Sequence, residues 1–304
     1  MATKKHRKMI GDSRVFTLLL RILLALFMAL LLVTVIKTCS DCRRKAIIDQ
    51  TGYLPDDENW DSIPDITPPY NPEDLDSLPQ SVLIESLFPP IGNQGSRGTC
   101  VAWAVGYNMK TALNARQNHW TESDLRNPEN QTSPKDLWLG IPPNQKGAYC
   151  EGTTFHPTFS VLANQGAADM KRVPYHNLGN CGGIATGNPD NRIKGFGCLT
   201  TKPDPTNLRI LKAYIRDSIP LVISARLGDS FMKWNDDTPI KTDTYRYNGR
   251  HAYHAMVLSG YDDARNSFRV RNSWGPEWGD KGSIWVDYDF FCNSFCEEVF
   301  VAEN

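Results

Sequence analysis

The chain has 304 residues, which is enough for one sizeable domain or two small ones. Its 33 Lys and Arg residues nearly balance its 34 Asp and Glu residues, and 40% of the residues are hydrophobic. A nucleic-acid binder usually carries a basic excess or stripe, so no nucleic acid is expected as a partner. The sequence has no HExxH motif and no paired CxxC motifs, so neither a metal nor a cofactor is expected.

An apolar segment at residues 15–36, "VFTLLLRILLALFMALLLVTVI", predicts a transmembrane signal anchor. As a helix it reaches roughly 33 Å, about the thickness of a bilayer core. Its only charge, Arg21, lies near one end, where the side chain can snorkel to the interface. A cleaved signal peptide is the main alternative, but the following "KTCSDCRRK" is a poor cleavage site. Lys37 and Thr38 likewise disfavour lipid attachment at Cys39.

The flanks of this segment are both basic, with five Lys and Arg before it and four soon after it. This difference decides little about orientation. We expect residues 1–14 to be a cytoplasmic tail, because so short a tail is easily retained. The domain after the segment is then extracytoplasmic, in the periplasm or outside the cell, which suits its several cysteines.

Residues 37–77 are predicted to be an acidic, Pro-rich linker. From residue 46 to residue 96 there is no Lys or Arg, but there are ten acidic residues and eight of the 20 prolines. Such a composition favours an extended, self-repelling spacer that holds a domain away from the membrane. The alternative is that part of it packs on the domain as a strap.

The stretch "IGNQGSRGTCVAWAVGY" at 91–107 is a glycine-rich loop that leads into a helical pattern. Val101, Ala102 and Val105 fall near helical spacing, which places Cys100 in the first turn of a buried helix. A helix N-terminus favours the thiolate, the nucleophilic form of cysteine. The alternative is a structural thiol, since free cysteines are often simply buried.

Two later stretches supply the groups that a thiol nucleophile needs. "HAYHAMVLSGYDD" at 251–263 places a histidine before a predicted strand. "FRVRNSWGPEWGDKGSIWVDY" at 268–288 predicts strand, turn and strand, with Asn272 at the end of the first apolar run. A cysteine nucleophile needs a base, a group that orients the base, and an oxyanion donor.

Three motifs in this order resemble the papain-like cysteine peptidase family. "NQGSRGTC" is similar to the family's loop with an oxyanion glutamine before the nucleophile, which maps to Gln94 and Cys100. "HAMVLSGY" is similar to the strand that opens with the catalytic histidine, here His254. "NSWGPEWGDKG" is similar to the asparagine-bearing hairpin, with Asn272 and with Trp274 shielding the His–Asn hydrogen bond.

The resemblance implies an α+β fold of two subdomains over residues 78–304. The helical half carries Cys100, the antiparallel, barrel-like β half carries His254 and Asn272, and substrate lies in the cleft between them. "YCEGTTF" resembles the strand that pairs with substrate backbone, with Gly152 at the matching position. Ala255, next to the histidine, maps to the main specificity pocket.

The resemblance also implies a thiol-dependent endopeptidase that acts on a polypeptide substrate, and we expect a monomer. Cys100 attacks, His254 moves the proton, and a thiolate–imidazolium pair gives activity from mildly acid to neutral pH. His251 is an alternative base outside the matching strand, and Gln94 is alternatively a loop-bracing amide. Two other functions remain open: a non-catalytic binding module on this fold, and acyl transfer to a nucleophile other than water.

The spacer is too short for the family's long inhibitory propeptide. Activation is therefore expected by cleavage within residues 46–90 or without any zymogen step.

The chain has eight cysteines, and the "CSDC" at 39–42 is an isolated motif at the membrane edge. The family often has a cysteine three residues before the nucleophile, but Arg97 stands there, so its usual disulfide with Cys150 is not expected. The plausible pairs are then Cys181–Cys198 and Cys292–Cys296, with Cys150 left over.

Overall fold

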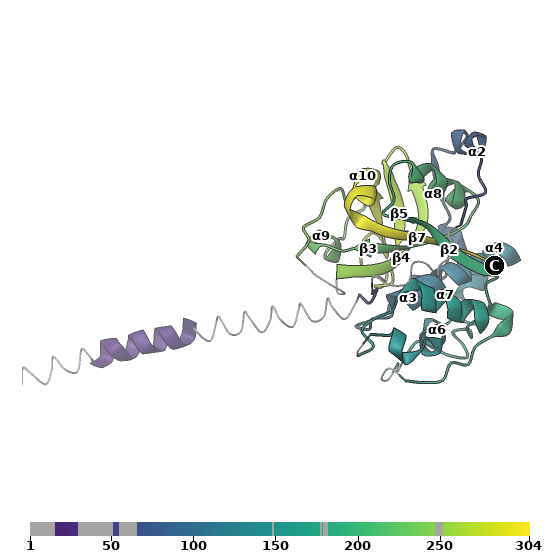
Figure 1. Ribbon diagram of the computed structural model, residues 1–304. Coiled ribbons are helices and arrows are strands. Elements are labelled where there is room, and N and C mark those ends of the chain that lie inside the picture. The colour runs from purple at the N-terminus through teal and green to yellow at the C-terminus, as the bar shows by residue number, and fades with distance from the viewer. Residues whose placement is uncertain are drawn as a thin grey trace, which may run out of the picture. The chain divides into compact units, whose positions relative to one another are not determined.

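A computed structural model describes residues 16–29, 51–54, 66–147, 149–176, 178, 182–246 and 252–304. The chain forms two compact units, Met1–Ile47 and Ile48–Asn304 (Figure 1). In the first unit residues 16–29 are helical, and their large apolar side chains are exposed. Within the described ranges no helix is both long and apolar enough to cross a membrane. The rest of the predicted span, residue 15 and residues 30–36, lies outside these ranges, so the membrane span stays a prediction.

The second unit has a helical half built around one long buried helix. Helix α3 (Cys100–Ala102) continues through the π-helical turns of η3 (Trp103–Lys110) into α4 (Thr111–Asn118). Every side chain from residue 100 to residue 113 is buried, as expected for a helix that is mainly apolar all round. The helix ends at His119, whose φ of 53° is left-handed and whose amide donates to the Ala115 carbonyl.

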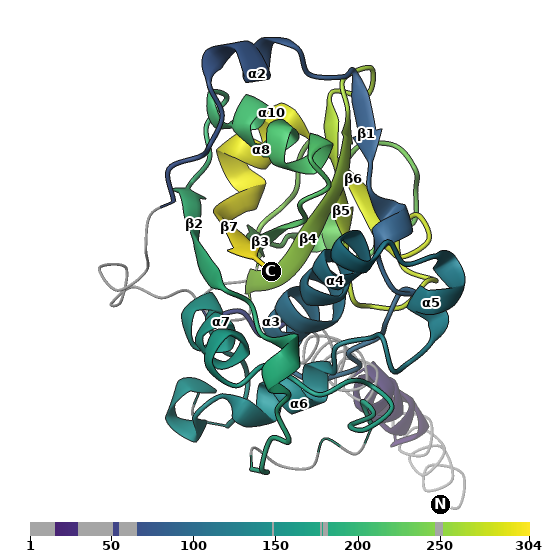
Figure 2. The ribbon, with the colours of Figure 1, turned by 90° about the vertical axis from the view of Figure 1, so that its right-hand side faces the viewer.

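Shorter helices surround this central helix. Ser133 caps one of them by accepting from the Asp136 amide, and Pro134 occupies its first turn. Helices α6 and α7 pack against α3 and lie together below the sheet in Figures 1 and 2. The elements are α5 (Glu122–Arg126), α6 (Pro134–Gly140), η4 (Pro143–Gln145), α7 (Phe155–Asn164) and η5 (Pro189–Asn191).

The other half is an antiparallel sheet with strand order β2-β7-β3-β4-β5-β6, and β1 pairs with β4 off this path. The central strands β3, β4 and β5 are almost completely buried, and their polar side chains, such as those of Arg269 and Arg271, are buried with them. The strands are β1 (Ser81–Leu83), β2 (Gly195–Thr201), β3 (Leu221–Arg226), β4 (Tyr253–Asp262), β5 (Ser267–Arg271), β6 (Ser283–Asp287) and β7 (Cys296–Glu303).

Short helices complete the β half, and α8 packs against β3 and β4 (Figure 2). They are α2 (Pro72–Asp76), η2 (Glu85–Leu87), α8 (Asn207–Arg216), α9 (Asp229–Met232), α10 (Tyr288–Phe290) and η7 (Phe291–Phe295). The two halves meet where α3 and η3 pack against β4. This α+β architecture agrees with the predicted papain-like fold.

The described parts of the predicted linker pack on the domain. The Ile66 amide donates to the Cys198 carbonyl at 3.2 Å, and the Tyr70 ring meets Tyr214 edge to face at 5.0 Å. The Arg216 guanidinium donates to the Asp74 carbonyl at 2.9 Å. These residues therefore form the strap that was the alternative to an extended spacer.

The predicted disulfide pairs are wrong. Within the described part of the chain, Cys198, Cys292 and Cys296 carry free thiols. Cys150, expected to be left over, is the disulfide-bonded cysteine, and its partner lies outside the described residues. Proximity in sequence misled the prediction: Cys292 lies within the helical turn η7 and Cys296 is the residue that ends it, and both thiols are free.

Candidate active site

Cys100 begins helix α3 at the junction between the two halves. Thr99 precedes it as the N-cap residue, and the hydroxyl groups of Thr99 and Tyr175 are hydrogen-bonded at 2.6 Å. The amide of Ala255, on strand β4, donates to Cys100 Sγ at 3.5 Å. This contact connects the nucleophile with the strand that carries His254.

His254 and Asn272 lie together as predicted, with His254 Nε2 and Asn272 Oδ1 2.7 Å apart. Asn272 directly follows strand β5, and its backbone N–H donates to the Gly282 carbonyl across the hairpin at 3.0 Å. Because Oδ1 is an acceptor, His254 carries its hydrogen on Nε2, which leaves a lone pair on Nδ1. Nδ1 is buried and has no hydrogen-bond partner among the described residues.

The ring of Trp274 lies beside this pair. Its centroid is 4.7 Å from that of His254, with the planes inclined by 35°. The rings of Phe231 and Trp278 pack in turn against Trp274. This aromatic cluster keeps water from the His–Asn hydrogen bond, as the resemblance implied.

Both candidate catalytic groups are completely buried, and this reverses the expected direction of their pKa shifts. Burial raises the pKa of Cys100 to about 12, although hydrogen bonds from the backbone of Ala255 and Val101 act the other way. Burial lowers the pKa of His254 to about 4, against the raising effect of Asn272. Burial therefore favours the neutral thiol and the neutral imidazole in this state, and the thiolate–imidazolium pair stays a prediction.

The segment Thr51–Leu54 lies against the loop that precedes Cys100. The backbone of the segment forms two hydrogen bonds with Thr153. The Leu54 amide donates to the Thr153 carbonyl, and the Thr153 amide donates to the Gly52 carbonyl, each at 2.9 Å. A side chain at Gly52 would come within 2.4 Å of the Gly98 backbone. The backbones of three glycines are thus in direct contact, namely those of Gly52, Gly98 and Gly152. Gly98 lies two residues before Cys100 in sequence.

The chain's own segment thus pairs with the edge at Thr153, next to Gly152, and the pairing of Gly152 with substrate stays a prediction. Thr153, which replaces a glycine common in the family, still pairs through its backbone. Ala255 contacts the nucleophile and Trp274 covers the histidine, so both predicted substrate-site residues lie in the site. The alternative base, His251, lies outside the described residues.

Gln94 is braced between the nucleophile loop and the asparagine hairpin. Its Nε2 donates to the Arg97 carbonyl at 2.8 Å, and its Oε1 accepts from the Ser273 hydroxyl at 2.7 Å. The hydroxyl of Tyr175 donates to the Gln94 carbonyl at 3.0 Å. A primary amide carries two hydrogens, so the bracing and the oxyanion role are compatible. The part of the chain that the structure describes contains no group of three or more His, Cys, Asp or Glu that could hold a metal.

Arg271 is a positioning residue that the sequence analysis did not single out. It is 4% exposed, and its Nε donates to Asn108 Oδ1 on η3 at 3.1 Å. The same guanidinium donates to the Pro89 carbonyl and lies 3.9 Å from Glu85 Oε2. It therefore ties Asn272, its neighbour in sequence, to the central helix.

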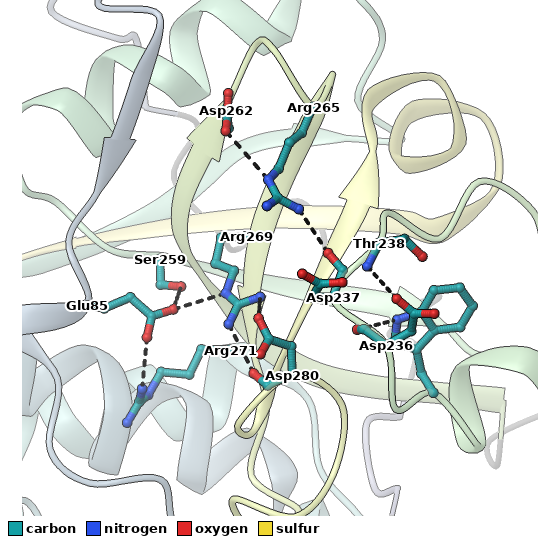
Figure 3. A network of polar contacts seen from close by, with 11 residues as sticks. Glu85, Asp236, Asp237, Thr238, Ser259, Asp262, Arg265, Arg269, Arg271 and Asp280 are labelled. Carbon is teal, nitrogen blue, oxygen red and sulfur yellow. Dashed lines mark hydrogen bonds and ion pairs between the residues drawn. The ribbon is translucent and has the colours of Figure 1, made fainter.

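Figure 3 shows how Glu85 joins this arginine to a wider polar network. The carboxylate of Glu85 also accepts from Arg269 at 3.3 Å and from Ser259 at 3.2 Å. Arg269 in turn pairs with Asp280 at 2.8 Å. The sequence did contain a signal, because Arg269 and Arg271 share one face of an otherwise apolar predicted strand.

Comparison with known proteins identifies the class. The papain family cysteine protease profile matches residues 78–297, so the chain belongs to that family. It is a cysteine peptidase, a hydrolase that acts on peptide bonds.

Among curated relatives, Cathepsin B-like CP1 of Giardia intestinalis is 24% identical over 73% of this chain and 72% of its own length. Cysteine protease 1 of Oryza sativa is 26% identical over 71% of this chain but only 42% of its own length. Xylellain, a cysteine protease from Xylella fastidiosa, superposes with a TM-score of 0.67 at 22% identity, covering 84% of this chain and 96% of its own. Procathepsin L2 from Tenebrio molitor larval midgut gives 0.66 at 18% identity, covering 86% and 80%. At these identities the structural likeness shows the fold.

Replacing Arg271 by Met should destabilise the domain by about 1–3 kcal/mol, because the buried acceptors Asn108 Oδ1 and the Pro89 carbonyl would lose their donor. Arg265→Met is the matched control, since Arg265 is 41% exposed in the turn between β4 and β5 and its replacement should cost at most about 1 kcal/mol. Urea unfolding monitored by tryptophan fluorescence measures both. Equal losses in the two variants would contradict the positioning role.

A second prediction concerns the free energy of unfolding at acid pH. The unfolded imidazole has an ordinary pKa of 6.5, whereas folded His254 has a pKa of about 4, so the unfolded state binds the proton first. The stabilising effect of the neutral imidazole is complete above pH 6.5 and is lost as the pH falls toward 4. The wild type should thus lose up to about 3 kcal/mol of unfolding free energy relative to His254→Gln over this window. Parallel pH profiles of the two proteins in urea unfolding would disprove this.

Proposed function

We propose that the chain is a thiol-dependent endopeptidase whose catalytic groups are Cys100, His254, Asn272 and Gln94. The observation that carries the proposal is the short His254–Asn272 hydrogen bond, with the lone pair of Nδ1 left unpartnered by the described residues and with the adjacent amide on Cys100 Sγ. An imidazole held in this tautomer is ready to accept a proton.

In the proposed reaction Nδ1 takes the thiol proton as Sγ attacks the peptide carbonyl. The backbone N–H of Cys100 and the amide of Gln94 stabilise the oxyanion. His254 then returns the proton to the leaving amine, and the C–N bond breaks to leave a thioester. Water, deprotonated by the same imidazole, hydrolyses the thioester and regenerates the thiol. Asn272 keeps the imidazole in the productive orientation throughout.

The observed state is proposed to be latent, because Thr51–Leu54 occupies the backbone edge at Gly152 and Thr153. When this segment leaves, water reaches both catalytic groups. Hydration favours their charged forms, so the pKa of the thiol falls and that of the imidazole rises. Removal of the segment by cleavage or by displacement would therefore activate the enzyme.

The membrane anchor at residues 15–36 and the extracytoplasmic location remain proposals. The helical, exposed and apolar character of residues 16–29 supports the anchor, and the disulfide at Cys150 fits an oxidising compartment. Carbonate extraction of membranes and protease protection of intact cells would test them. Release of the chain by carbonate would reject the anchor, and protection of the domain from protease even after the outer envelope is opened, with the inner membrane left intact, would reject the extracytoplasmic location. A polypeptide substrate and a monomeric enzyme complete the proposed function, and sedimentation of the purified chain tests the latter.

Substitution of Cys100 by Ala should abolish hydrolysis of a denatured protein by the reduced, full-length chain, with a loss of at least about 10³-fold. Cys292→Ala is the control, because Cys292 also carries a free thiol but lies outside the site. Release of acid-soluble peptides measures the rate. Activity that survived in the Cys100 variant would reject the proposed nucleophile.

Gly52→Val should release the covering segment. Gly52 has a φ of 147°, which disfavours other residues, and the new side chain would collide with the Gly98 backbone. Alkylation of Cys100 by iodoacetamide at pH 7.5, followed by mass spectrometry, should rise roughly tenfold or more, as expected from the loss of burial. Gly195→Val is the control, because no atom lies within 4 Å of its added carbon. Unchanged labelling in Gly52→Val would contradict latency.

A further inference from the structure

The loop that precedes the nucleophile has one of the proposed oxyanion donors at each end. Gln94 at its start offers a side-chain amide, and Thr99 at its end forms the peptide bond whose N–H belongs to Cys100. Residues 95–97 between these ends are exposed. Arg97 stands where the family often has a cysteine, so the usual disulfide does not fasten this loop.

One tyrosine hydroxyl connects the two ends of the loop. Tyr175 Oη donates to the Gln94 carbonyl at 3.0 Å and lies 2.6 Å from Thr99 Oγ1. A phenol carries a single hydrogen, so Thr99 is the donor in the second hydrogen bond. Tyr175 thus bridges two residues from which it is 81 and 76 positions away in sequence.

The backbone on both sides of Tyr175 is fixed to helix α6. Ser133 Oγ donates to the Val173 carbonyl at 2.6 Å, and Lys135 Nζ donates to the His176 carbonyl at 2.8 Å. Ser133 is the N-cap residue of the helix and is completely buried. The helical half of the domain therefore holds the tyrosine in place.

The central helix supports the ring of Tyr175. This ring meets Trp103 edge to face, with centroids 4.7 Å apart and planes inclined by 73°. Burial raises the pKa of Tyr175 above its ordinary value. The hydroxyl consequently stays protonated at neutral pH and remains a donor to the Gln94 carbonyl.

We propose that Tyr175 is a positioning residue, which holds the two oxyanion donors at the spacing that the tetrahedral intermediate requires. This inference rests on the proposed peptidase function. The hydroxyl acts only through the Gln94 carbonyl and the Thr99 hydroxyl. Preorganised donors stabilise an oxyanion because they need no rearrangement as its charge develops, and a misplacement of about 1 Å can reduce a rate roughly 100-fold.

Tyr175→Phe removes the hydroxyl but keeps the ring that packs on Trp103. In the full-length chain acting on a fluorogenic peptide, kcat should fall by roughly tenfold or more, because the donors are no longer preorganised. KM should stay within about twofold, since the oxyanion forms only in the transition state. Unchanged kcat, or a rise in KM that accounts for the whole loss, would overturn the inference while leaving the peptidase proposal intact.

Tyr107→Phe is the matched control. The ring of Tyr107 also meets Trp103 edge to face with centroids 4.7 Å apart, and its hydroxyl donates to the Pro90 carbonyl at 2.9 Å. The control loses a comparable hydrogen bond outside the loop at 94–99, so its kcat should stay within about twofold of the wild type. Equal losses in the two variants would assign the effect to general destabilisation and overturn the positioning role.

A double variant tests whether the hydroxyl acts through Gln94. Gln94→Ala removes one of the two donors, so adding Tyr175→Phe should then reduce kcat by a smaller factor than in the wild type. Equal factors in the two backgrounds would overturn the action through Gln94.

Alkylation of Cys100 by iodoacetamide develops no oxyanion and depends on the thiol alone. Tyr175→Phe should therefore leave its rate within about twofold of the wild type. A fall in alkylation as large as the fall in kcat would show that the hydroxyl acts on the thiol, which would overturn the inference.

Hydrogen exchange tests the bridge without hydrolysis. The Thr99 amide donates to the Arg97 carbonyl at 2.8 Å within the closed loop. In Tyr175→Phe it should exchange roughly fivefold faster or more, because the two hydrogen bonds that join the ends of the loop are lost. Tyr107→Phe should leave this exchange unchanged.

The two readouts separate the proposals. Faster exchange without hydrolysis of any peptide would support the bridge and reject the peptidase proposal. Unchanged exchange in Tyr175→Phe would overturn the role of Tyr175.

Discussion

A thiol and an imidazole that act together must come from distant parts of this chain, and the packing of helix α3 against strand β4 brings them together. The contact of the Ala255 amide with Cys100 Sγ marks this junction. The remaining features of the site orient these two groups or control the access of water to them. Asn272 holds the imidazole, Trp274 covers it, and Gln94 links the loop before Cys100 to the asparagine hairpin.

Rigid support for the junction comes from buried polar groups rather than from apolar packing alone. Arg271 spans from the strand that precedes Asn272 to the central helix, and Glu85 holds it from the side (Figure 3). Burying a guanidinium is unfavourable, and its pKa is lowered to about 10 by that burial. Such a group contributes orientation more clearly than net stability, since two halves joined by apolar contacts alone could slide.

Water exclusion has opposite effects on catalysis and on latency. A dry site strengthens the His254–Asn272 hydrogen bond, but it also keeps the thiol and the imidazole neutral. The segment Thr51–Leu54 pairs with Thr153 through a backbone contact that resembles a bound peptide, which is the contact behind the proposed latency.

Much of the candidate site could be predicted from sequence, because the chemistry of its groups is carried by short local motifs. Gln94, Cys100, His254 and Asn272 each stand in a loop, helix start or strand end whose pattern is local. The helical half and the antiparallel half followed from the same resemblance, and the observed fold agrees with them. The packing of the acidic segment was harder to foresee, because composition favoured a solvated spacer over the strap that forms.

The sequence by itself determined which residues are the candidates for the nucleophilic, basic and orienting roles, since their identities and the local motifs around them are enough to single them out. Only the tertiary structure decided the pKa directions of Cys100 and His254, the state of the cysteines, and the hydrogen bonds of Tyr175 with the loop before Cys100. These properties depend on burial and on partners remote in sequence. No local pattern records how completely folding removes a thiol from water, or which loop a distant tyrosine will reach.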